Sequence, residues 1–341
     1  MNEPICIDRV AIVVPVLNEA RDIAACLASL LPQAATLDAD VLVVDGGSTD
    51  ATAAIVTALQ KIHPRIKLLD NPRRLQSAAM NLAARAAASD VTVLVRADGH
   101  AAYPADFVAT CLAALRGHGA TSVVVPMRTV GTSGMQRAIA AAQNGRLGNG
   151  GSAHRAGGAS GFVDHGHHAA FDRAFFRRIG GYDESFAYNE DAEHDERVRR
   201  AGGRVWMCAE ATIDYFPRSR LRPLAQQYFR HGAGRVRTLL KHHIRPRPRQ
   251  LAAPVVLVGS VAGIALTPFD AWFAVVPLGY VLACSAWAGV AAIRARDPWL
   301  IGMAPAAMTM HLSWAAGFLR TLGRAGREGM RTRRVQLATA G

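Results

Sequence analysis

The fold is decided by the stretch Val91-Thr92-Val93-Leu94-Val95-Arg96-Ala97-Asp98-Gly99-His100, in which an apolar run ends abruptly in an acid and an imidazole two residues apart. The β-branched run predicts a buried strand. Open α/β sheets keep their ligand crevice at the carboxyl ends of such strands. Because residues i and i+2 of an extended chain point to the same side, we expect Asp98 and His100 to reach one ion together or to flank one phosphate.

Strands and helices alternate along the chain on both sides of this stretch. Apolar runs predict strands at Val10–Val16, Asp40–Val44, Ile66–Leu69, Val91–Val95 and Ser122–Met127. Apolar spacing and capping residues predict helices at Ala20–Leu31, from Ser48 or Thr49 to about His63, and at Gln76–Ala88, Pro104–Arg116, Phe171–Ile179 and Asn189–Ala201. This alternation predicts an α/β fold with a doubly wound, mostly parallel sheet and helices on both of its faces.

The composition of the 341-residue chain changes near residue 250. Residues 251–319 contain four charged side chains, at positions 270, 294, 296 and 297, whereas the preceding sequence mixes charged and apolar residues as soluble proteins do. We expect a soluble domain over residues 1–218 and a basic amphipathic interfacial helix or linker over 219–250. Two to three transmembrane helices are expected over 251–319, followed by a basic tail over 320–341.

Lysine and arginine outnumber aspartate and glutamate by 39 to 26. The excess is concentrated at Arg218–Arg249 and Arg320–Arg334, beside the apolar region, where it suits an anionic cytoplasmic lipid surface. These runs are not interleaved with aromatic residues, so nucleic acid is not an expected partner. The five cysteines are scattered, which is typical of a reducing compartment, and the N-terminus shows no signal peptide. The first domain is therefore expected in the cytosol.

Three apolar segments follow residue 250, at Leu251–Phe269, Trp272–Ile293 and Trp299–Leu319. Each is close to the roughly 30 Å needed to cross a bilayer. Phe269-Asp270-Ala271 has no basic residue and is expected outside, with Arg245–Arg249 and Arg294–Arg296 inside. A third crossing would place the basic tail outside. The third segment, which contains Pro305 and His311, therefore either violates the positive-inside rule or is re-entrant or interfacial.

Two predicted strand ends carry polar motifs, Val13-Val14-Pro15-Val16-Leu17-Asn18-Glu19 and Val44-Asp45-Gly46-Gly47-Ser48-Thr49-Asp50. Together they resemble the opening of the family 2 glycosyltransferases, whose GT-A fold binds a nucleotide-sugar. The resemblance implies that the uridine of a UDP-sugar donor is held by Pro15, Asn18, Glu19 and Asp45. A carboxylate at a strand end accepts from the uracil N–H or the ribose hydroxyls, and glycines let the backbone approach the ligand. Gly-Gly-Ser-Thr-Asp alone also suits an ordinary helix cap.

The resemblance continues at Arg96-Ala97-Asp98-Gly99-His100, in the place of the family's Asp-x-Asp. In the family these acids bind a divalent cation that bridges the donor diphosphate and neutralises the charge of the leaving group. Asp98 is thereby implied in donor and metal binding, with Mg²⁺ or Mn²⁺ as the cofactor. His100 replaces the second acid, and an imidazole ligates Mn²⁺ more readily than Mg²⁺. A strand-end turn with a hydrogen-bonded histidine is the alternative.

Asn189-Glu190-Asp191-Ala192-Glu193 resembles the Glu-Asp pair of the same family. The resemblance implies that Asp191 is the general base that takes the proton from the acceptor hydroxyl, while Glu190 orients the acceptor or the loop. Adjacent carboxylates raise one another's pKa, which suits a base that works near neutral pH. In the alternative interpretation these acids only favour the dipole at a helix N-terminus.

Two further motifs resemble the family less closely. Gln227 and Arg230 match the Gln-x-x-Arg-Trp of membrane-embedded members, in which it lines the donor diphosphate, but His231 replaces the tryptophan. The same segment also predicts a basic amphipathic helix on the membrane surface, and both interpretations can hold. In His165-Gly166-His167-His168, no cysteine and no acid except Asp164 stands at ligand spacing, so a substrate-lining role is favoured over a metal site.

The resemblance extends to the subgroup that makes succinoglycan and related exopolysaccharides, through Gly150–Arg155, Val163-Asp164, Gly180–Glu184 and Tyr215–Arg218. It implies an inverting hexosyltransferase that uses UDP-glucose or a similar UDP-sugar at the bacterial inner (cytoplasmic) membrane, with its catalytic domain in the cytosol. Few membrane spans favour a lipid-linked saccharide as the acceptor. A processive polysaccharide synthase and a non-catalytic membrane scaffold of a polysaccharide assembly are the alternative functions.

Overall fold

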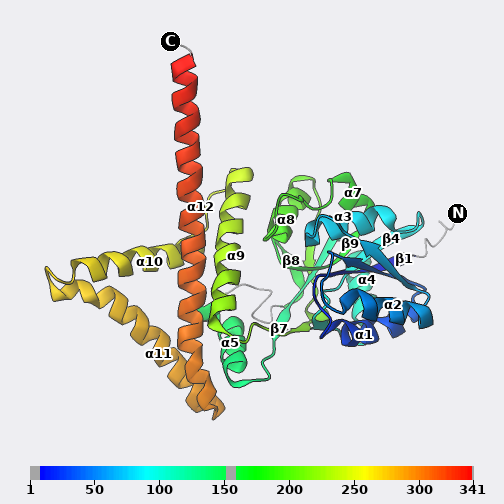
Figure 1. The fold of residues 1–341 in the computed structure, drawn as a ribbon, viewed down its shortest axis with the longest axis horizontal. Helices are drawn as coiled ribbons and strands as arrows, with labels where there is room; N and C mark the ends of the chain where they lie inside the picture. The colour runs from blue at the N-terminus through cyan, green and yellow to red at the C-terminus, as the bar shows by residue number, and fades with distance from the viewer. Residues whose placement is uncertain (1–7, 151–158, 340–341) are drawn as a thin grey trace. The chain divides into compact units, whose positions relative to one another are not determined.

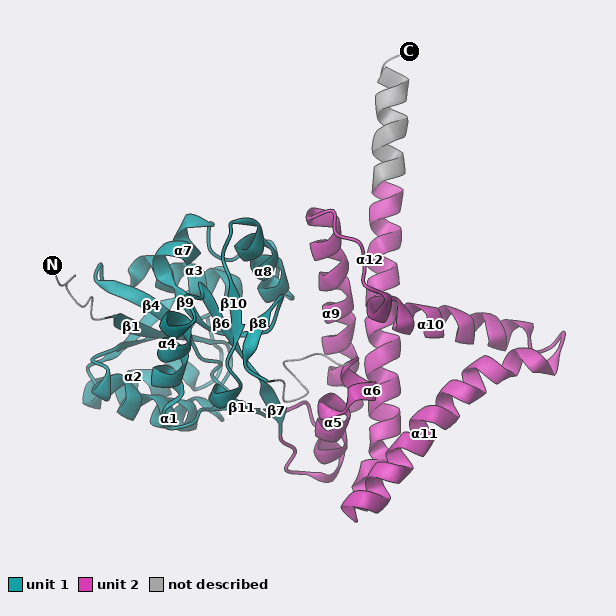
Figure 2. Cartoon of the chain, turned by 180° about the vertical axis from the view of Figure 1, so that it is seen from behind, with its two compact units in different colours: residues 1–129, 152–216 teal, residues 130–151, 217–341 magenta. Residues whose placement is uncertain are grey.

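The computed structural model describes residues 8–150 and 159–339, with side chains described as far as residue 328. The chain forms two compact units, residues 1–129 with 152–216 and residues 130–151 with 217–341 (Figure 2). Residues 130–151, which the sequence predicts within the first domain, therefore belong to the second unit. Most of the predicted motif Gly150–Arg155 lies outside the described residues.

The first unit is built on an eight-stranded sheet with the strand order β3-β2-β1-β4-β9-β6-β10-β8 (Figure 1). Its strands are β1 (Arg9–Val16), β2 (Asp40–Asp45), β3 (Ile66–Asp70), β4 (Val91–Arg96), β6 (Ser122–Val125), β8 (Gly161–Val163), β9 (His167–Asp172) and β10 (Val205–Met207). Neighbouring strands are parallel, except that β9 is antiparallel to β4 and β6 and β8 is antiparallel to β10. The predicted mostly parallel sheet is confirmed. A second sheet holds β5 (Ala101–Ala102), β7 (Met127–Thr129) and β11 (Ile213–Tyr215).

Helices cover both faces of the larger sheet. They are α1 (Ile23–Thr36), α2 (Thr52–Ile62), α3 (Gln76–Ala86), α4 (Phe107–Gly117), α7 (Arg173–Arg178) and α8 (Glu190–Arg200). Ile12 of β1 belongs to a core that also contains Ile23 of α1, whereas the next residue, Val13, belongs to a second core with Met80 of α3. Because successive side chains of a strand point to opposite faces, both faces of β1 are buried and its sequence is an unbroken apolar run.

The segment predicted as a helix at Phe171–Ile179 is a strand followed by a helix. β9 inserts between β4 and β6, antiparallel to both, and α7 begins only at Arg173. Asp172 ends the strand, because its Oδ1 accepts a hydrogen bond of 2.8 Å from the Phe175 amide at the start of α7. The prediction was wrong because the partners that fix β9 as a strand lie far from it in sequence, where a local pattern carries no information about them.

The second unit begins with two helices, α5 (Gly134–Asn144) and α6 (Arg146–Asn149), in a glycine-rich segment. Its glycines allow close packing. A Cβ on Gly134 would lie 2.3 Å from the Trp299 ring, and one on Gly148 would lie 2.0 Å from the Ala142 carbonyl oxygen. These distances are too short for a real Cβ atom, so glycine at these two positions allows the neighbouring atoms to pack directly against the backbone.

Two long helices of the second unit, α9 (Leu221–Lys241) and α12 (Met303–Thr339), lie side by side (Figure 2). They approach through glycines, since a Cβ on Gly232 would lie 2.0 Å from the Trp314 carbonyl oxygen. Val236 and Leu239 of α9 are buried in a core with Phe318 of α12. Part of the apolar face of α9, which the sequence predicts on a membrane surface, therefore packs against α12. The membrane-surface location of the helix stays a prediction.

Two helices of the described residues are long and apolar enough to cross a membrane, Pro248–Leu266 and Ala271–Ala295. The first is α10, and the second joins a short 3₁₀ turn to α11 (Val275–Ala295). Their apolar side chains are mostly exposed, among them Val261, Ile264 and Ile293. The third predicted apolar segment forms a 3₁₀ turn and the start of α12, where side chains such as Met310 are buried inside the unit.

Candidate functional site

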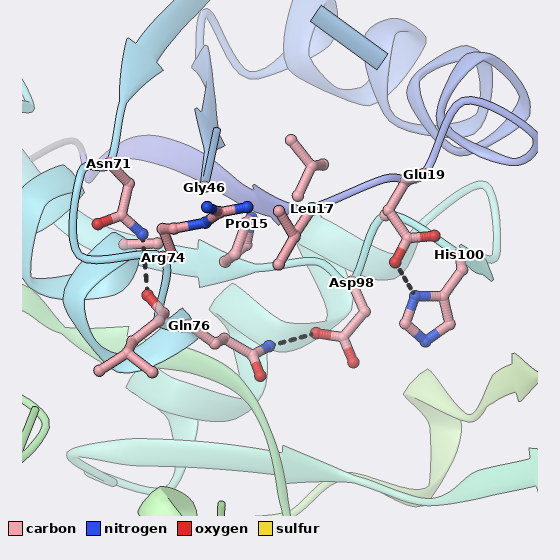
Figure 3. Close-up of a pocket in the computed structure, with 13 residues that line it drawn as sticks. Pro15, Leu17, Glu19, Gly46, Asn71, Arg74, Gln76, Asp98 and His100 are labelled. Atoms are coloured by element: carbon pink, nitrogen blue, oxygen red, sulfur yellow. Dashed lines mark hydrogen bonds and ion pairs between the residues drawn. The ribbon is translucent and has the colours of Figure 1, made fainter. Parts of the chain in front are cut away.

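A pocket opens in the first unit at the carboxyl ends of β1, β2 and β4. The strand register brings these ends together, because Val16 is paired with Asp45 and Val13 with Arg96. The polar lining residues are Glu19, Asn71, Arg74, Gln76, Asp98 and His100 (Figure 3). Pro15 and Gly46 complete its wall. Four of the residues predicted for donor or metal binding, Pro15, Glu19, Asp98 and His100, therefore line one pocket.

Asn18 and Asp45 act within the loops around this pocket. Asp45 accepts hydrogen bonds from the amide of Ser48 at 3.1 Å and from its hydroxyl at 2.5 Å. The side-chain oxygen of Asn18 accepts from the Thr49 backbone amide at 2.8 Å, and the backbone amide of Asn18 donates to the Ser48 hydroxyl at 2.8 Å. The Gly-Gly-Ser-Thr-Asp motif thus joins the two strand-end loops. The predicted cap from Ser48 or Thr49 is wrong, because α2 begins at Thr52 and its amide donates to Asp50.

His100 pairs with Glu19, one of the acids predicted to bind the donor. Its Nδ1 lies 2.9 Å from Glu19 Oε1 (Figure 3). Its ring stands edge-on to Tyr215, with the ring centroids 5.9 Å apart. The expectation that strand parity orients His100 is wrong, because β4 ends at Arg96 and Gly99 and His100 form a turn. The turn brings both Asp98 and His100 into the pocket lining all the same.

Asp98 is surrounded by hydrogen-bond donors. Gln76 Nε2 donates to Asp98 Oδ1 at 3.0 Å and Arg96 Nε donates to the same oxygen at 3.2 Å, while His167 Nε2 lies 3.4 Å from Oδ2. Burial acts to raise the pKa of this carboxyl, but the charges of Arg96 and His167 outweigh it and hold the pKa well below its usual range. Asp98 is therefore an anion at any physiological pH, as a cation ligand must be.

Glu190 and Asp191 are the first two residues of α8, and their pKa values are shifted in opposite directions. Burial, followed by the charge of Asp191, raises the pKa of Glu190 to about 8. Burial also acts on Asp191, but Arg96 and nearby histidines outweigh it and lower the pKa of that carboxyl. The sequence predicted a raised pKa for the base Asp191. That prediction was wrong because the buried cation Arg96 is distant in sequence, and the raised pKa belongs to Glu190.

The histidines of the His165–His168 motif meet a residue that sequence reasoning missed. Both carboxylate oxygens of Asp195 are engaged, one by His165 Nδ1 at 3.0 Å and the other by His168 Nε2 at 2.7 Å. Burial acts to raise the pKa of Asp195, but its contacts with His168 and His165 hold it well below its usual range. His168 is fully buried and lines no surface, whereas His167 reaches Asp98. The available signal was the spacing of four residues between Asp191 and Asp195, which places both on one helix face.

Two groups of side chains have the chemistry to hold a metal ion. His168, His194 and Asp195 offer ligand atoms within 4.8 Å of one another. His194 there is a neutral ring, since burial lowers its pKa well below the usual value, and it packs against Phe176. At the pocket, the anionic Asp98 and the imidazole of His100 both line the wall, while His167 Nε2 lies 3.4 Å from Asp98 Oδ2, and the ligand atoms of these three do not all lie within 4.8 Å of one another. A carboxylate with an imidazole suits Mn²⁺, and Mg²⁺ less well.

Other residues were missed or remain untested. Arg74 adopts a left-handed conformation with φ +57°, and its Nη2 lies 3.4 Å from the Gly47 carbonyl oxygen at the pocket (Figure 3). Gln76 begins α3 and reaches Asp98. Neither follows from the strand-end motifs. Gln227 and Arg230 lie on α9 in the second unit, whereas the pocket belongs to the first, so their donor contacts stay a prediction.

The chain is similar to known proteins in sequence and in fold. Residues 11–180 match the family model described as glycosyl transferase family 2. The chain is 45% identical over 312 residues to the succinoglycan biosynthesis protein ExoA of Rhizobium meliloti (strain 1021). The aligned region covers 91% of this chain and 94% of that protein. Among solved structures, the mannosyltransferase PcManGT from Pyrobaculum calidifontis, in complex with GDP-Man and Mn²⁺, is similar with a TM-score of 0.57 at 21% identity, over 92% of this chain and 87% of that one.

Proposed function

Because this chain belongs to glycosyltransferase family 2 and has the GT-A fold, we propose that it transfers a hexose from a UDP-sugar to a lipid-linked saccharide in exopolysaccharide biosynthesis. The observation that carries the proposal is the cation Arg96, which contacts the pocket acid Asp98 at 3.2 Å and lies 4.0 Å from Glu190, next to the proposed base Asp191. The identity with the succinoglycan protein supports the polysaccharide class, with glucose as the first donor sugar to test.

The proposed donor subsite lies between the loops after β1 and β2. Pro15 and Glu19 line it, and Asn18 and Asp45 fix the loops that shape it. A uridine presents an N–H and two ribose hydroxyls to these acceptors. The guanidinium of Arg74 stands at the same pocket and is suited to an anionic phosphate or a uracil carbonyl.

A divalent cation is the proposed cofactor, held by Asp98 and His100. When bound, it supplies the positive charge that neutralises the diphosphate as it leaves. Asp98 meets the requirement for this role because Arg96 and His167 keep it ionised. The imidazole ligand favours Mn²⁺, and the similar mannosyltransferase structure contains Mn²⁺.

The proposed reaction is a single in-line displacement at the anomeric carbon. Asp191 takes the proton of the acceptor hydroxyl while its oxygen forms the new bond to that carbon. The bond from the carbon to the diphosphate oxygen breaks, its electron pair leaves with UDP, and the configuration inverts. Because the pKa of Glu190 is about 8, this residue keeps its proton near neutral pH and adds no second negative charge beside the base.

Membrane attachment through α10 and α11 places the enzyme near a lipid-linked acceptor. Two crossings return the chain to the side on which it began. The basic residues before α10 and those of α12 then share one side, which the positive-inside rule identifies as the cytosol. This arrangement removes the conflict that a third crossing would create, and it puts the catalytic domain where UDP-sugars are made.

The test is UDP release by the full chain in membranes, supplied with UDP-glucose, undecaprenyl-diphosphate-linked oligosaccharide and Mn²⁺. Asp191→Asn should lower turnover by about 100-fold or more while UDP still binds in a titration. Glu196→Gln is the matched control, because Glu196 lies on the same helix but pairs with Arg200. Full turnover in Asp191→Asn would remove Asp191 as the base. Product length in the same assay separates single transfer from processive synthesis, and absent UDP binding would indicate a scaffold.

A further inference from the structure

Arg96 is the buried cation on which both halves of the proposed site depend. Its side chain is 4% exposed, and it contacts Asp98 through Nε and lies near Glu190 through Nη1. The same Nη1 donates a hydrogen bond of 3.2 Å to the Tyr182 hydroxyl. A guanidinium buried to this degree is held in place by the acceptors around it, because each lost acceptor costs desolvation free energy.

The hydrogen bonds beyond Tyr182 lead to Asp195. The Tyr182 oxygen accepts from Arg96, and His168 Nδ1 lies 2.5 Å from the same oxygen. On its other side, His168 Nε2 lies 2.7 Å from Asp195 Oδ1. In a neutral imidazole, a proton donated from Nε2 to the carboxylate leaves Nδ1 to accept from the Tyr182 hydroxyl, so Asp195 acts through His168 on the hydroxyl that holds Arg96.

The chain of contacts closes on the helix from which it starts. Asp195 lies on α8, His168 on β9, Tyr182 in the loop after α7 and Arg96 at the end of β4. From Arg96 the contact at 4.0 Å leads back to Glu190 at the first residue of α8. The start of α8, which carries Asp191, is therefore tied to the end of β4, next to Asp98.

Resting on the proposed function, we propose that His168 and Tyr182 are positioning residues of the transfer reaction. Together with Asp195 they hold Arg96, and Arg96 fixes the distance between Asp98, on the leaving-group side, and Asp191, on the acceptor side. Neither residue lines the pocket proposed for the donor. An in-line displacement requires both acids in register at once, so a small displacement of one lowers the rate more than it lowers donor binding.

The test is Tyr182→Phe, which removes the hydroxyl and keeps the ring. We expect kcat to fall by about tenfold or more, while KM for UDP-glucose and the Kd for UDP with Mn²⁺ change by less than about threefold. His168→Gln, which retains an acceptor and a donor, should keep more of the native rate than His168→Ala. Equal kcat in Tyr182→Phe and the native chain would overturn the proposal, as would a loss confined to KM.

Phe176→Leu is the matched control, because Phe176 packs on Tyr182 with centroids 5.6 Å apart and carries no polar group. It should lower the melting temperature without lowering kcat per folded molecule. A fall in kcat equal to that of Tyr182→Phe would show that only general packing matters and would overturn the proposal.

A native chain that releases no UDP would contradict the proposed function, and thermal unfolding then decides about the contact chain by itself. Tyr182 and Glu190 both face Arg96, so the effects of Tyr182→Phe and Glu190→Gln on the melting temperature should not add. Additive effects would overturn the link.

Discussion

The imidazole of His100 lies 2.9 Å from the carboxylate of Glu19, so the residue in the place of a second metal-binding acid is paired with a predicted donor-binding acid. This contact orients the ring in the pocket that Asp98 also lines. An imidazole so placed offers the cation a nitrogen where the family's acid would offer an oxygen, and nitrogen ligands favour Mn²⁺ over Mg²⁺.

His100→Asp should therefore change the metal preference of the enzyme. Replacing the imidazole by a carboxylate restores an all-oxygen ligand set, and we expect the ratio of Mn²⁺-supported to Mg²⁺-supported turnover to fall by about tenfold. UDP release measured over a concentration series of each cation checks this. Glu19→Gln is the control, because its amide oxygen can still accept a hydrogen bond from His100 and it should weaken donor binding without changing that ratio. An unchanged ratio in His100→Asp would take His100 out of the metal site.

The raised pKa of Glu190 makes the stability of the chain depend on pH. Its pKa rises from 4.5 to about 8 on folding, so the folded chain binds more protons than the unfolded chain between these values. Stability therefore falls as the pH rises through this window. Glu190→Gln has no proton to lose, so its melting temperature relative to the native chain should rise between about pH 5 and about pH 9, by roughly 3 °C or more.

Thermal unfolding at a series of pH values provides the measurement. Glu210→Gln is the control, since its hydrogen bond with Ser160 lowers the pKa of Glu210 and keeps the carboxylate charged throughout the window. Its effect on the melting temperature should be the same at every pH. A flat difference for Glu190→Gln as well would show that Glu190 carries no proton in the folded chain.

The parts of the site that the sequence predicts are those set by the parallel strands. Glu19, Asp45 and Asp98 each follow an apolar strand, and parallel strands in register bring their carboxyl ends to one edge. The residue types and the order of the strands are therefore enough to place these acids together. The same reasoning identified the mostly parallel sheet and the helices on its two faces.

The parts that could not be predicted depend on contacts between distant segments. β9 is a strand because β4 and β6 flank it, and only this insertion brings His168 to Asp195 and Tyr182. The pKa values of the Glu190–Asp191 pair depend on burial and on the cation Arg96, about a hundred positions earlier in the chain. The spacing of residues along the sequence therefore predicts neither the pairing of β9 nor these pKa shifts.

Gly232 should tolerate no side chain. A Cβ there would lie 2.0 Å from the Trp314 carbonyl oxygen, so Gly232→Val must push α9 away from α12 and should destabilise the second unit by about 1–3 kcal/mol. Gly323 on α12 is the matched control, because no described atom lies within 4 Å of its added Cβ. Gly323→Ala should instead stabilise the helix by about 1 kcal/mol. Thermal unfolding in detergent checks both, and a neutral Gly232→Val would contradict the close helix approach.

A two-span anchor predicts which loops face the outside of the cell. Ala271, the first residue of the second candidate span, should lie at the outer end of that span, and Ala295, its last residue, should lie in the cytosol. Each is exposed and is replaced by cysteine in a Cys6→Ser background, in which the cysteines at positions 26, 111, 208 and 284 are buried. A membrane-impermeant maleimide applied to intact cells should label Ala271→Cys at once and Ala295→Cys only after permeabilisation. The reverse pattern would put the proposed catalytic unit outside, away from its nucleotide-sugar, and labelling of both would rule out two crossings.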